Sequence, residues 1–504
     1  MVTPIAVTPP RRKMGIHPFL KDIGSTAIAG VLIMVSSAIL ISLLGRAMGA
    51  NPLAQYLLVR RIVAWMQSSL IVCSALALPY YVSRQKTEGE GVEYFVAALA
   101  TDSMFVLVAG ILLLSAPHFF SHWLFGDGQL TGFLFPVSIW ALGYVFHVSA
   151  FGYHRGRLKM LTANVLQLVN IGVLIFLTFA IFQRSRNIMA MLTWTGILMM
   201  AFSTLYAFPR KGIIDARWVH IVVKAKALIK YGLPRIPSQF GFIGLTALGP
   251  IIALHYLPLR DVTFLLLGGT LFNAFSLGVM PLSVVLLSKV SRMISENRIE
   301  DVSRRLEQML TGVLHMSFFS MVIAMVFADV GLRIWLGKEF VNGAWTVRIL
   351  LLGLPFYAYI SSISSSIDAA HVKAHNSANM IVSLACYVAL SGIAVYVAPR
   401  QYLSPAIALA WSATLVILAV LTARSARQLL RTKLPLRASF PGILAALALG
   451  GVGLLFRRFS HLQGNTTVVL EVIIGLSASY AAILFASGTG WVREFRQMLS
   501  HHSA

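Results

Sequence analysis

The stretch KYGLPRIPSQFG, Lys230 to Gly241, places two prolines and an arginine at the start of a run that is apolar as far as Leu257. Proline has no backbone N–H and disfavours helix in the residue before it. A charge that faces lipid is also costly. The stretch therefore predicts that a membrane-spanning segment begins here with a deformed backbone. The alternative is that the prolines form a simple N-terminal helix cap, because proline is favoured in the first turn of a helix.

The composition around this stretch is that of a membrane protein. The chain has 504 residues, of which 58% are hydrophobic and 12% are charged, and its mean hydropathy is +0.79. A soluble protein of this length has about 25% charged residues. The apolar residues form long blocks between short basic linkers, and a bilayer span needs about 20 of them in a row.

The apolar blocks predict an all-α polytopic membrane protein with about 14 transmembrane helices. The expected spans are 23–45, 57–82, 94–117, 130–153, 162–182, 188–208, 233–257, 261–288, 307–329, 345–368, 377–398, 405–423, 438–456 and 466–486. No linker between them is long enough to form a soluble domain.

A long basic linker divides the chain into units. The predicted domains are an N-terminal six-helix lobe at 1–208, a cytoplasmic linker at 209–230, a C-terminal six-helix lobe at 231–424, and two extra transmembrane helices with a cytoplasmic tail at 425–504.

The basic residues predict the orientation in the membrane. If the N-terminus is inside and the spans alternate, the inside segments hold 28 of the 41 Lys and Arg residues and the outside segments hold 9. This bias predicts that both termini are cytoplasmic. It also accounts for most of the net charge of +24 without a nucleic-acid partner.

Sequence motifs of the common enzymes are absent. The chain has no G-x-x-x-x-G-K-[ST], HExxH, CxxC or GxSxG, and these patterns are needed to cradle phosphate, to bind metal or to present a nucleophile. Its two cysteines, Cys73 and Cys386, both lie inside predicted spans. We therefore expect no catalytic residue, no metal site, no cofactor and no disulfide, and a carrier rather than an enzyme.

Four stretches resemble the multidrug/oligosaccharidyl-lipid/polysaccharide exporter superfamily, and within it the flippases of O-antigen and exopolysaccharide repeat units. They are KYGLPRIPSQF; GLRIWLGKEFVNG, Gly331–Gly343; SSIDAAHVKAHN, Ser365–Asn376; and SPAIALAWSA, Ser404–Ala413. They cover mostly the second half of the chain. The number and order of the predicted spans carry as much of the resemblance as these motifs.

The resemblance implies two six-helix lobes in a V-shaped arrangement plus two C-terminal helices. It further implies a flippase that moves undecaprenyl-pyrophosphate-linked oligosaccharide across the bacterial cytoplasmic (inner) membrane by alternating access. A polysaccharide polymerase and a chain-length regulator are the implied protein partners, besides membrane lipids. Family members often have an aspartate in the middle of span seven, but here that region, Phe242 to Leu254, carries no charge. Any coupling role of that acid is therefore not implied.

A pyrophosphate that leaves water needs cationic partners, and arginine binds phosphate with a fork of donors. The candidate substrate-binding arginines are Arg60, Arg61, Arg235 and Arg348, all within or at the edge of predicted spans. The alternative is that each side chain extends to the nearest membrane interface. Prolines Pro234 and Pro237 flank Arg235 and form the predicted hinge.

Polar residues within the spans are the candidates for sugar contacts. They are Gln67, Asn164, Gln167, Asn170, Gln239 and Asn273. Asn164, Gln167 and Asn170 recur every three residues, so they share one helix face. The alternative for this stripe is hydrogen bonding between helices of one lobe.

Asp102 is the candidate ion-coupling residue. It lies about two turns into span three, where a carboxylate either pairs structurally or carries a proton during exchange. Transport that does not respond to a proton or sodium gradient would exclude the coupling role.

Three other functions compete with the flippase. A multidrug/cation antiporter would need carboxylates facing the cavity, yet intramembrane arginines outnumber good acid candidates here. A peptidoglycan-precursor flippase of the same superfamily stays open. A polymerase or glycosyltransferase would need a sizeable outside loop, and the sequence shows none.

Overall fold

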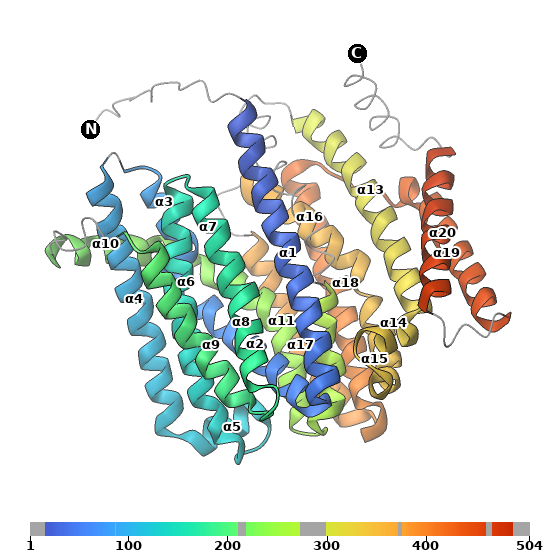
Figure 1. Cartoon of the computed structure of the whole chain (residues 1–504). Coiled ribbons are helices and arrows are strands. Elements are labelled where there is room, and N and C mark those ends of the chain that lie inside the picture. Colours follow the sequence, from blue (N-terminus) through green and yellow to red (C-terminus); the bar gives the residue numbers. More distant parts are fainter. Residues whose placement is uncertain are drawn as a thin grey trace.

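The structure is a computed structural model, and it describes residues 16–85, 87–209, 218–272, 299–370, 375–459 and 466–486. All secondary-structure elements within these ranges are helices, some of them short 3-10 or π segments. Figure 1 shows a bundle of long helices that run roughly between two faces of the molecule. We call the face at which α1 begins and α20 ends the terminal face (Figure 1). The positive-inside bias predicts that this face is cytoplasmic.

The first helix group contains the helices up to residue 207. Its elements are α1 (Ile16–Met48), α2 (Ala50–Leu70), η1 (Cys73–Ala77), α3 (Leu78–Val82), α4 (Glu88–Ser115), α5 (Pro117–Phe125), η2 (Leu130–Phe133), α6 (Leu134–Gly156), α7 (Met160–Gln167), η3 (Leu168–Val173), α8 (Leu174–Phe182), α9 (Ile188–Phe202) and η4 (Ser203–Ala207). Helix α6 is central in this group, since it packs against both α4 and α9.

The second helix group follows helix α10 (Trp218–Gly232). Its elements are η5 (Leu233–Arg235), α11 (Ile236–Leu254), a helical segment at 259–272, α13 (Ile299–Val326), α14 (Ala328–Trp335), η6 (Lys338–Gly343), α15 (Ala344–Leu351), α16 (Leu354–Ala370), α17 (His375–Val397), η7 (Arg400–Tyr402) and α18 (Leu403–Leu430). Helices α19 (Leu436–Phe459) and α20 (Thr466–Ala486) lie at the edge of the molecule, where α19 packs against α13 (Figure 1).

The described helices confirm the predicted all-α membrane fold. Ten of them are long and apolar enough to cross a bilayer, and the number rises to 12 if each of two bent helix pairs counts as one span. The predicted number of 14 is not confirmed. The expected span 261–288 lies partly outside the described residues, which stop at 272 and resume at 299.

Helix ends follow local chemistry. The side chain of Thr87 accepts a hydrogen bond from the backbone N–H of Glu90 and caps α4, and Asn187 caps α9 by accepting from the N–H of Ala190. Short oxygen-bearing side chains at this position satisfy one of the free donors of the first turn. Helix α5 ends at Gly126 in the left-handed conformation, with φ of 68°, which glycine adopts without a steric penalty.

The second predicted span is broken rather than straight. Helix α2 begins at Ala50, seven residues before the expected start, and a π-helical turn, η1, separates it from α3. Pro79 stands in the first turn of α3. Because proline has no N–H to donate, the regular α-helical ladder cannot continue through this turn.

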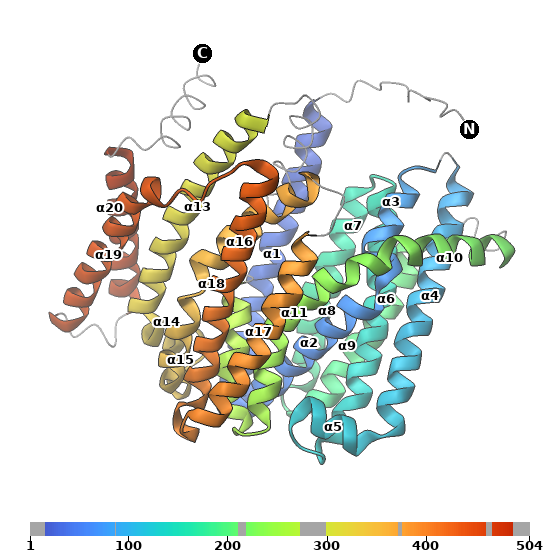
Figure 2. The ribbon, with the colours of Figure 1, turned by 180° about the vertical axis from the view of Figure 1, so that it is seen from behind.

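The stretch 230–241 also contains a break. Helix α10 (Trp218–Gly232) crosses the first helix group at a steep angle to α4 and α6 (Figure 2). The chain then passes through the 3-10 turn η5 into α11, and the helical axes differ by 56°. Gly232 fits only because it lacks a side chain, since a Cβ there would lie 2.5 Å from the carbonyl oxygen of Val72. The deformed start of α11 agrees with the sequence, whereas hinge motion at Pro234 and Pro237 stays a prediction.

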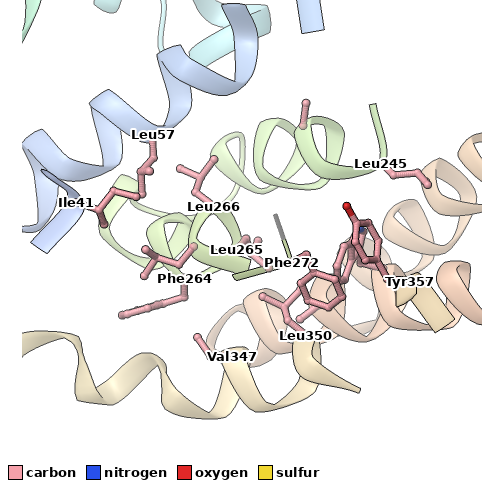
Figure 3. Packing of buried hydrophobic residues seen from close by; sticks show 14 of the residues in the cluster. Ile41, Leu57, Leu245, Phe264, Leu265, Leu266, Phe272, Val347, Leu350 and Tyr357 are labelled. Atoms are coloured by element: carbon pink, nitrogen blue, oxygen red, sulfur yellow. The ribbon is translucent and has the colours of Figure 1, made fainter. Parts of the chain in front are cut away.

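An apolar seam joins the two helix groups. Ile41 of α1 and Leu57 of α2 belong to the same buried cluster as Phe264 and Leu266 of segment 259–272, and Figure 3 shows Leu57 beside Leu266. Farther along, Figure 3 shows Phe272 next to Tyr357 of α16. Their rings meet edge to face with centroids 5.2 Å apart. The seam therefore consists of side chains from both groups.

Candidate functional site

A cavity of about 200 Å³ lies where the first helix group meets the start of α11. Its wall comes from three places in the chain: the end of α2 with η1, the middle of α6, and the stretch that opens α11. The lining residues are Gln67, Ser68, Ile71, Val72, Ala75, Val148, Gly232, Arg235, Ile236, Gln239 and Ile243. Two predicted site residues, Arg235 and Gln239, therefore line one cavity together with the candidate Gln67.

The polar groups of this cavity have unused hydrogen-bonding capacity. Arg235 and Gln239 are exposed. The amide nitrogen Nε2 of Gln67 is buried and makes no well-formed hydrogen bond within the part of the chain that the structure describes, although the hydroxyl of Tyr144 is close by. A buried donor without a partner is costly. An oxygen-rich ligand that accepts from this nitrogen would remove the cost.

Arg61 lies on the seam between the two helix groups. It is half-buried, eleven residues into α2, and its guanidinium lies against Gly269 of segment 259–272. A Cβ at Gly269 would overlap Arg61 Nη2, so the missing side chain makes room for the arginine. Among the described residues, no acid lies within ion-pair distance of Arg61. Its positive charge is therefore not neutralised by a described acidic partner.

Arg60 points into the first helix group instead. Its Nη1 donates to the hydroxyl of Ser37 at 2.8 Å. It lines a small cavity of about 20 Å³ together with Tyr144 and Asn170. Adjacent residues on a helix point about 100° apart, which explains why Arg60 and Arg61 lie in different surroundings.

The predicted polar stripe makes contacts between helices. Asn164 donates to Ser25 of α1 at 3.0 Å. The amide of Asn170 contacts Nδ1 of His147 at 3.0 Å and the hydroxyl of Ser203 at 2.9 Å. Hydrogen bonds between helices of one lobe were the alternative to sugar binding that the sequence analysis named for this stripe. Sugar binding by Asn164 and Asn170 stays a prediction.

For two further candidates for sugar contacts, the structure shows no contact that indicates a role. Gln167 is half-buried on the same helical stretch as Asn164. Asn273 lies outside the described residues.

Arg348 belongs to an ion-pair cluster away from the cavity. Its Nη2 is 3.1 Å from Asp329 Oδ1, and its Nε donates to the carbonyl of Met325 at 2.9 Å. Asp329 also pairs with Arg457 of α19 at 2.6 Å. The cluster connects α15, α14 and α19, so the structure gives Arg348 a structural partner, and Arg348 is not among the residues that line the cavity with Arg235.

Asp102 is fully buried in the first helix group. Its two carboxylate oxygens accept from the backbone N–H groups of Cys73 at 3.0 Å and Ser74 at 2.8 Å. These donors start the π-helical turn η1, where the regular backbone pairing is interrupted. The carboxylate therefore holds the break in the second span, next to Val72 and Ala75 of the cavity wall. Ion coupling by Asp102 stays a prediction.

The helix groups are fastened together far from the terminal face. The indole Nε1 of Trp335, at the end of α14, donates to the carbonyl of Ala38 at 2.8 Å. In return, the carbonyl of Trp335 accepts from Ser42 and Arg46 of α1. We call this set the α1–α14 latch. Trp335 lies within the quoted stretch GLRIWLGKEFVNG, but only its pairing with α1 reveals this contact.

A second contact joins α5 to the end of α11. The rings of His122 and His255 meet with centroids 5.2 Å apart. Gly126 lies so close to the carbonyl of Leu254 that a Cβ there would overlap the oxygen. Helix α5 lies at the end of the bundle opposite the terminal face in both views (Figures 1 and 2). The two groups are thus in direct contact on that side.

Comparison with known proteins shows the fold. No protein-family model matches the chain, and no curated protein matches it. Lipid II flippase MurJ in an inward closed conformation is similar, with a TM-score of 0.72 at 16% identity over 92% of this chain and 99% of that chain.

Multidrug exporters share the architecture too. An inward-facing multidrug resistance MATE family transporter of the MOP superfamily has a TM-score of 0.63 at 13% identity, over 86% of this chain and 96% of that chain. A mutant of the Vibrio cholerae MATE transporter VcmN has a TM-score of 0.56 at 13% identity, over 82% of this chain and 97% of that chain. The chain has the fold of this superfamily, which confirms at the level of fold the resemblance that its sequence indicated.

Proposed function

We propose that this chain, with the fold of the lipid flippases and multidrug exporters, moves undecaprenyl-pyrophosphate-linked oligosaccharide units across the bacterial cytoplasmic membrane for exopolysaccharide or O-antigen synthesis. One observation carries the proposal: Arg235, Gln239 and Gln67 line one cavity between the helix groups. Arg61 lies on the seam between the same two helix groups, against Gly269. This arrangement suits an anionic head group followed by sugars.

The chemistry of the cavity matches such a substrate. A pyrophosphate needs positive charge and N–H donors to replace its water shell. Arg235 and Arg61 supply both. The amides of Gln67 and Gln239 each offer donors and an acceptor, which are the groups that sugar hydroxyls pair with. The chain acts as a carrier in this account and catalyses no bond-breaking step.

The same features weigh against a cationic drug. A cation would need a free carboxylate at the cavity, but the carboxylate of Asp102 already accepts two backbone N–H groups. A peptidoglycan precursor remains the second candidate, because a similar structure is described as a lipid II flippase and its substrate would use the same anion-binding groups.

Transport is proposed to proceed by alternating access. The cavity opens beside α10 and η5, while the α1–α14 latch joins the helix groups elsewhere. In our proposal the terminal face is cytoplasmic, both termini lie in the cytoplasm, and the latch must open to release the substrate outside. A polysaccharide polymerase and a chain-length regulator are the proposed partners that receive the product.

Cross-linking the latch is expected to stop transport. A Cβ on Gly45 would lie 3.5 Å from Leu336 Cδ2, across the two helix groups. The double variant Gly45→Cys/Leu336→Cys, joined by a short bifunctional methanethiosulfonate that forms a disulfide with each cysteine, should lose transport and regain it when the disulfides are reduced. The matched control is Thr178→Cys/Thr195→Cys, whose hydroxyls are 2.8 Å apart within the first group. If the cross-linked latch variant transports at the same rate as the cross-linked control variant, opening of the latch is not required and this form of alternating access is contradicted.

Reconstitution tests the function directly. Purified protein in liposomes is given undecaprenyl-pyrophosphate-linked oligosaccharide on one leaflet, and exposure of the sugar on the other leaflet is measured with an impermeant lectin. Lipid II and a cationic dye are run in parallel. Transfer of the oligosaccharide lipid supports the proposal. Transfer of lipid II alone assigns the chain to peptidoglycan precursors, and dye efflux alone assigns it to drug export.

A further inference from the structure

Four aromatic and basic side chains form a column at the mouth of the cavity. The guanidinium carbon of Arg84 lies 3.9 Å from the ring centre of Tyr80. Tyr80 stacks on Tyr231 of α10 with ring centroids 4.5 Å apart. The guanidinium carbon of Arg235 lies 3.9 Å from the ring centre of Tyr231. The column thus runs from arginine to tyrosine to tyrosine to arginine, and it joins residues 80–84 to residues 231–235.

Stacking leaves the arginines able to bind an anion. A guanidinium that lies flat on a ring uses its face for the cation–π contact, while its N–H donors point outward in the plane. Arg84 and Arg235 are both exposed. The one hydrogen bond that Arg235 makes within the described chain goes from Nη1 to the carbonyl of Tyr231. Most donors of both groups therefore face solvent.

The acids beside the column, Glu93 and Glu90, form no ion pair with its two arginines, although Glu90 lies near the hydroxyl of Tyr94. Beside the column, the ring of Tyr81 meets those of Tyr80 and Tyr231 edge to face, with centroids 5.3 and 5.9 Å apart, and stacks on Tyr94 at 5.0 Å. The nearby carboxylate of Glu93 is already paired with Lys224 and contacts His220. Neither Arg84 nor Arg235 forms an ion pair with a residue that the structure describes. Both positive charges stay available to a ligand.

We propose that Arg84 and Arg235 form a two-guanidinium receptor for a phosphorylated head group at the cavity mouth, with Tyr80 and Tyr231 as the spacer that fixes their separation. The stacking distances put the two guanidinium carbons no more than about 12 Å apart. Arg84 captures the anion outside the cavity, and Arg235, which belongs to both the column and the cavity lining, takes it inward. The inference rests on the proposed function and adds a capture step to it.

Binding to Arg84 variants tests the receptor. The protein is placed in nanodiscs of neutral lipid and titrated with inorganic pyrophosphate in one arm; in the other arm the nanodiscs contain a polyisoprenyl pyrophosphate. Arg84→Gln is expected to weaken binding about tenfold, the loss typical of one charge-assisted contact. The matched control is Arg155→Gln, because Arg155 is also exposed and lies over a single ring, that of Phe151, at 5.4 Å.

Tyrosine variants separate binding from mere packing. Tyr80→Phe keeps the stacking ring and should bind as the wild type does. Tyr80→Ala removes the spacer and should bind as weakly as Arg84→Gln. Thermal unfolding is recorded for each variant. The receptor is supported when Arg84→Gln loses affinity without a change in unfolding temperature, which a purely structural arginine would not do.

The two arms also identify the ligand source. If Arg84→Gln loses affinity for the polyisoprenyl pyrophosphate, the receptor captures a lipid-linked head group. If Arg84→Gln loses affinity only for inorganic pyrophosphate in solution, the receptor is assigned to a soluble anion. Equal binding by Arg84→Gln and wild type in both arms, or no binding by wild type in either, overturns the inference. A different result would overturn the proposed function alone. In that case pyrophosphate binds and its binding depends on Arg84, but the protein does not transfer the oligosaccharide lipid.

Discussion

Arg235→Gln and Arg61→Gln are each expected to lower the rate of oligosaccharide-lipid transfer by at least about tenfold. One charge-assisted hydrogen bond to a phosphate contributes roughly 1.5–3 kcal/mol, and 1.4 kcal/mol is a factor of ten. Glutamine keeps much of the side-chain length but has no charge. The initial rate in reconstituted liposomes measures the effect, with the amount of inserted protein determined for each variant.

A surface arginine provides the control. Arg304 is exposed on α13 and forms an ion pair with Asp301 one turn away, and such exposed pairs contribute only about 0–1 kcal/mol. Arg304→Gln should transfer substrate at the wild-type rate. Arg348→Gln should instead lower the amount of folded protein, since it breaks the cluster with Asp329. Full transfer by both Arg235→Gln and Arg61→Gln would exclude the anion-binding account of the seam.

Gly196→Ala is expected to destabilise the first helix group strongly. A Cβ at Gly196 of α9 would lie 2.7 Å from the carbonyl oxygen of Ile139 and 2.8 Å from the Cα of Trp140, both on α6. These are backbone atoms, which cannot move aside as a flexible side chain can. Small residues let membrane helices approach closely, and overpacking costs about 1–3 kcal/mol. Thermal unfolding of the purified variant in detergent should show a clearly lower midpoint.

Gly143→Ala should act similarly, because its Cβ would lie 2.6 Å from the carbonyl oxygen of Gly196. Gly392→Ala on α17 is the control, since nothing lies within 4 Å of the new Cβ. In that open place, alanine is the better helix former by about 1 kcal/mol. If Gly196→Ala unfolds at the same temperature as Gly392→Ala, the two helices do not pack as closely as described.

The two breaks in the helices differ in how they are held. Pro79 interrupts the second span, and the carboxylate of Asp102 takes the backbone donors of Cys73 and Ser74. The break before α11 is instead held by packing, where Gly232 touches the carbonyl of Val72. Both breaks border the same cavity. Irregular backbone at membrane depth is tolerated where it lines a cavity or is buried in protein, which fits both places.

The sequence by itself determined the class of protein and the position of the break before α11. Long apolar blocks need a membrane because water cannot solvate so much apolar surface. The break at Pro234 and Pro237 is equally local, since proline changes its own backbone and that of the residue before it wherever it stands.

Only the tertiary structure decided the surroundings of each polar residue. Arg60 and Arg61 are adjacent and chemically identical, yet one donates to Ser37 and the other fills the space left by Gly269, more than 200 residues away in the chain. Asn164 likewise meets Ser25 of α1. A helical period states which residues share a face, but the neighbour of that face depends on how distant helices pack, and no local pattern contains that information.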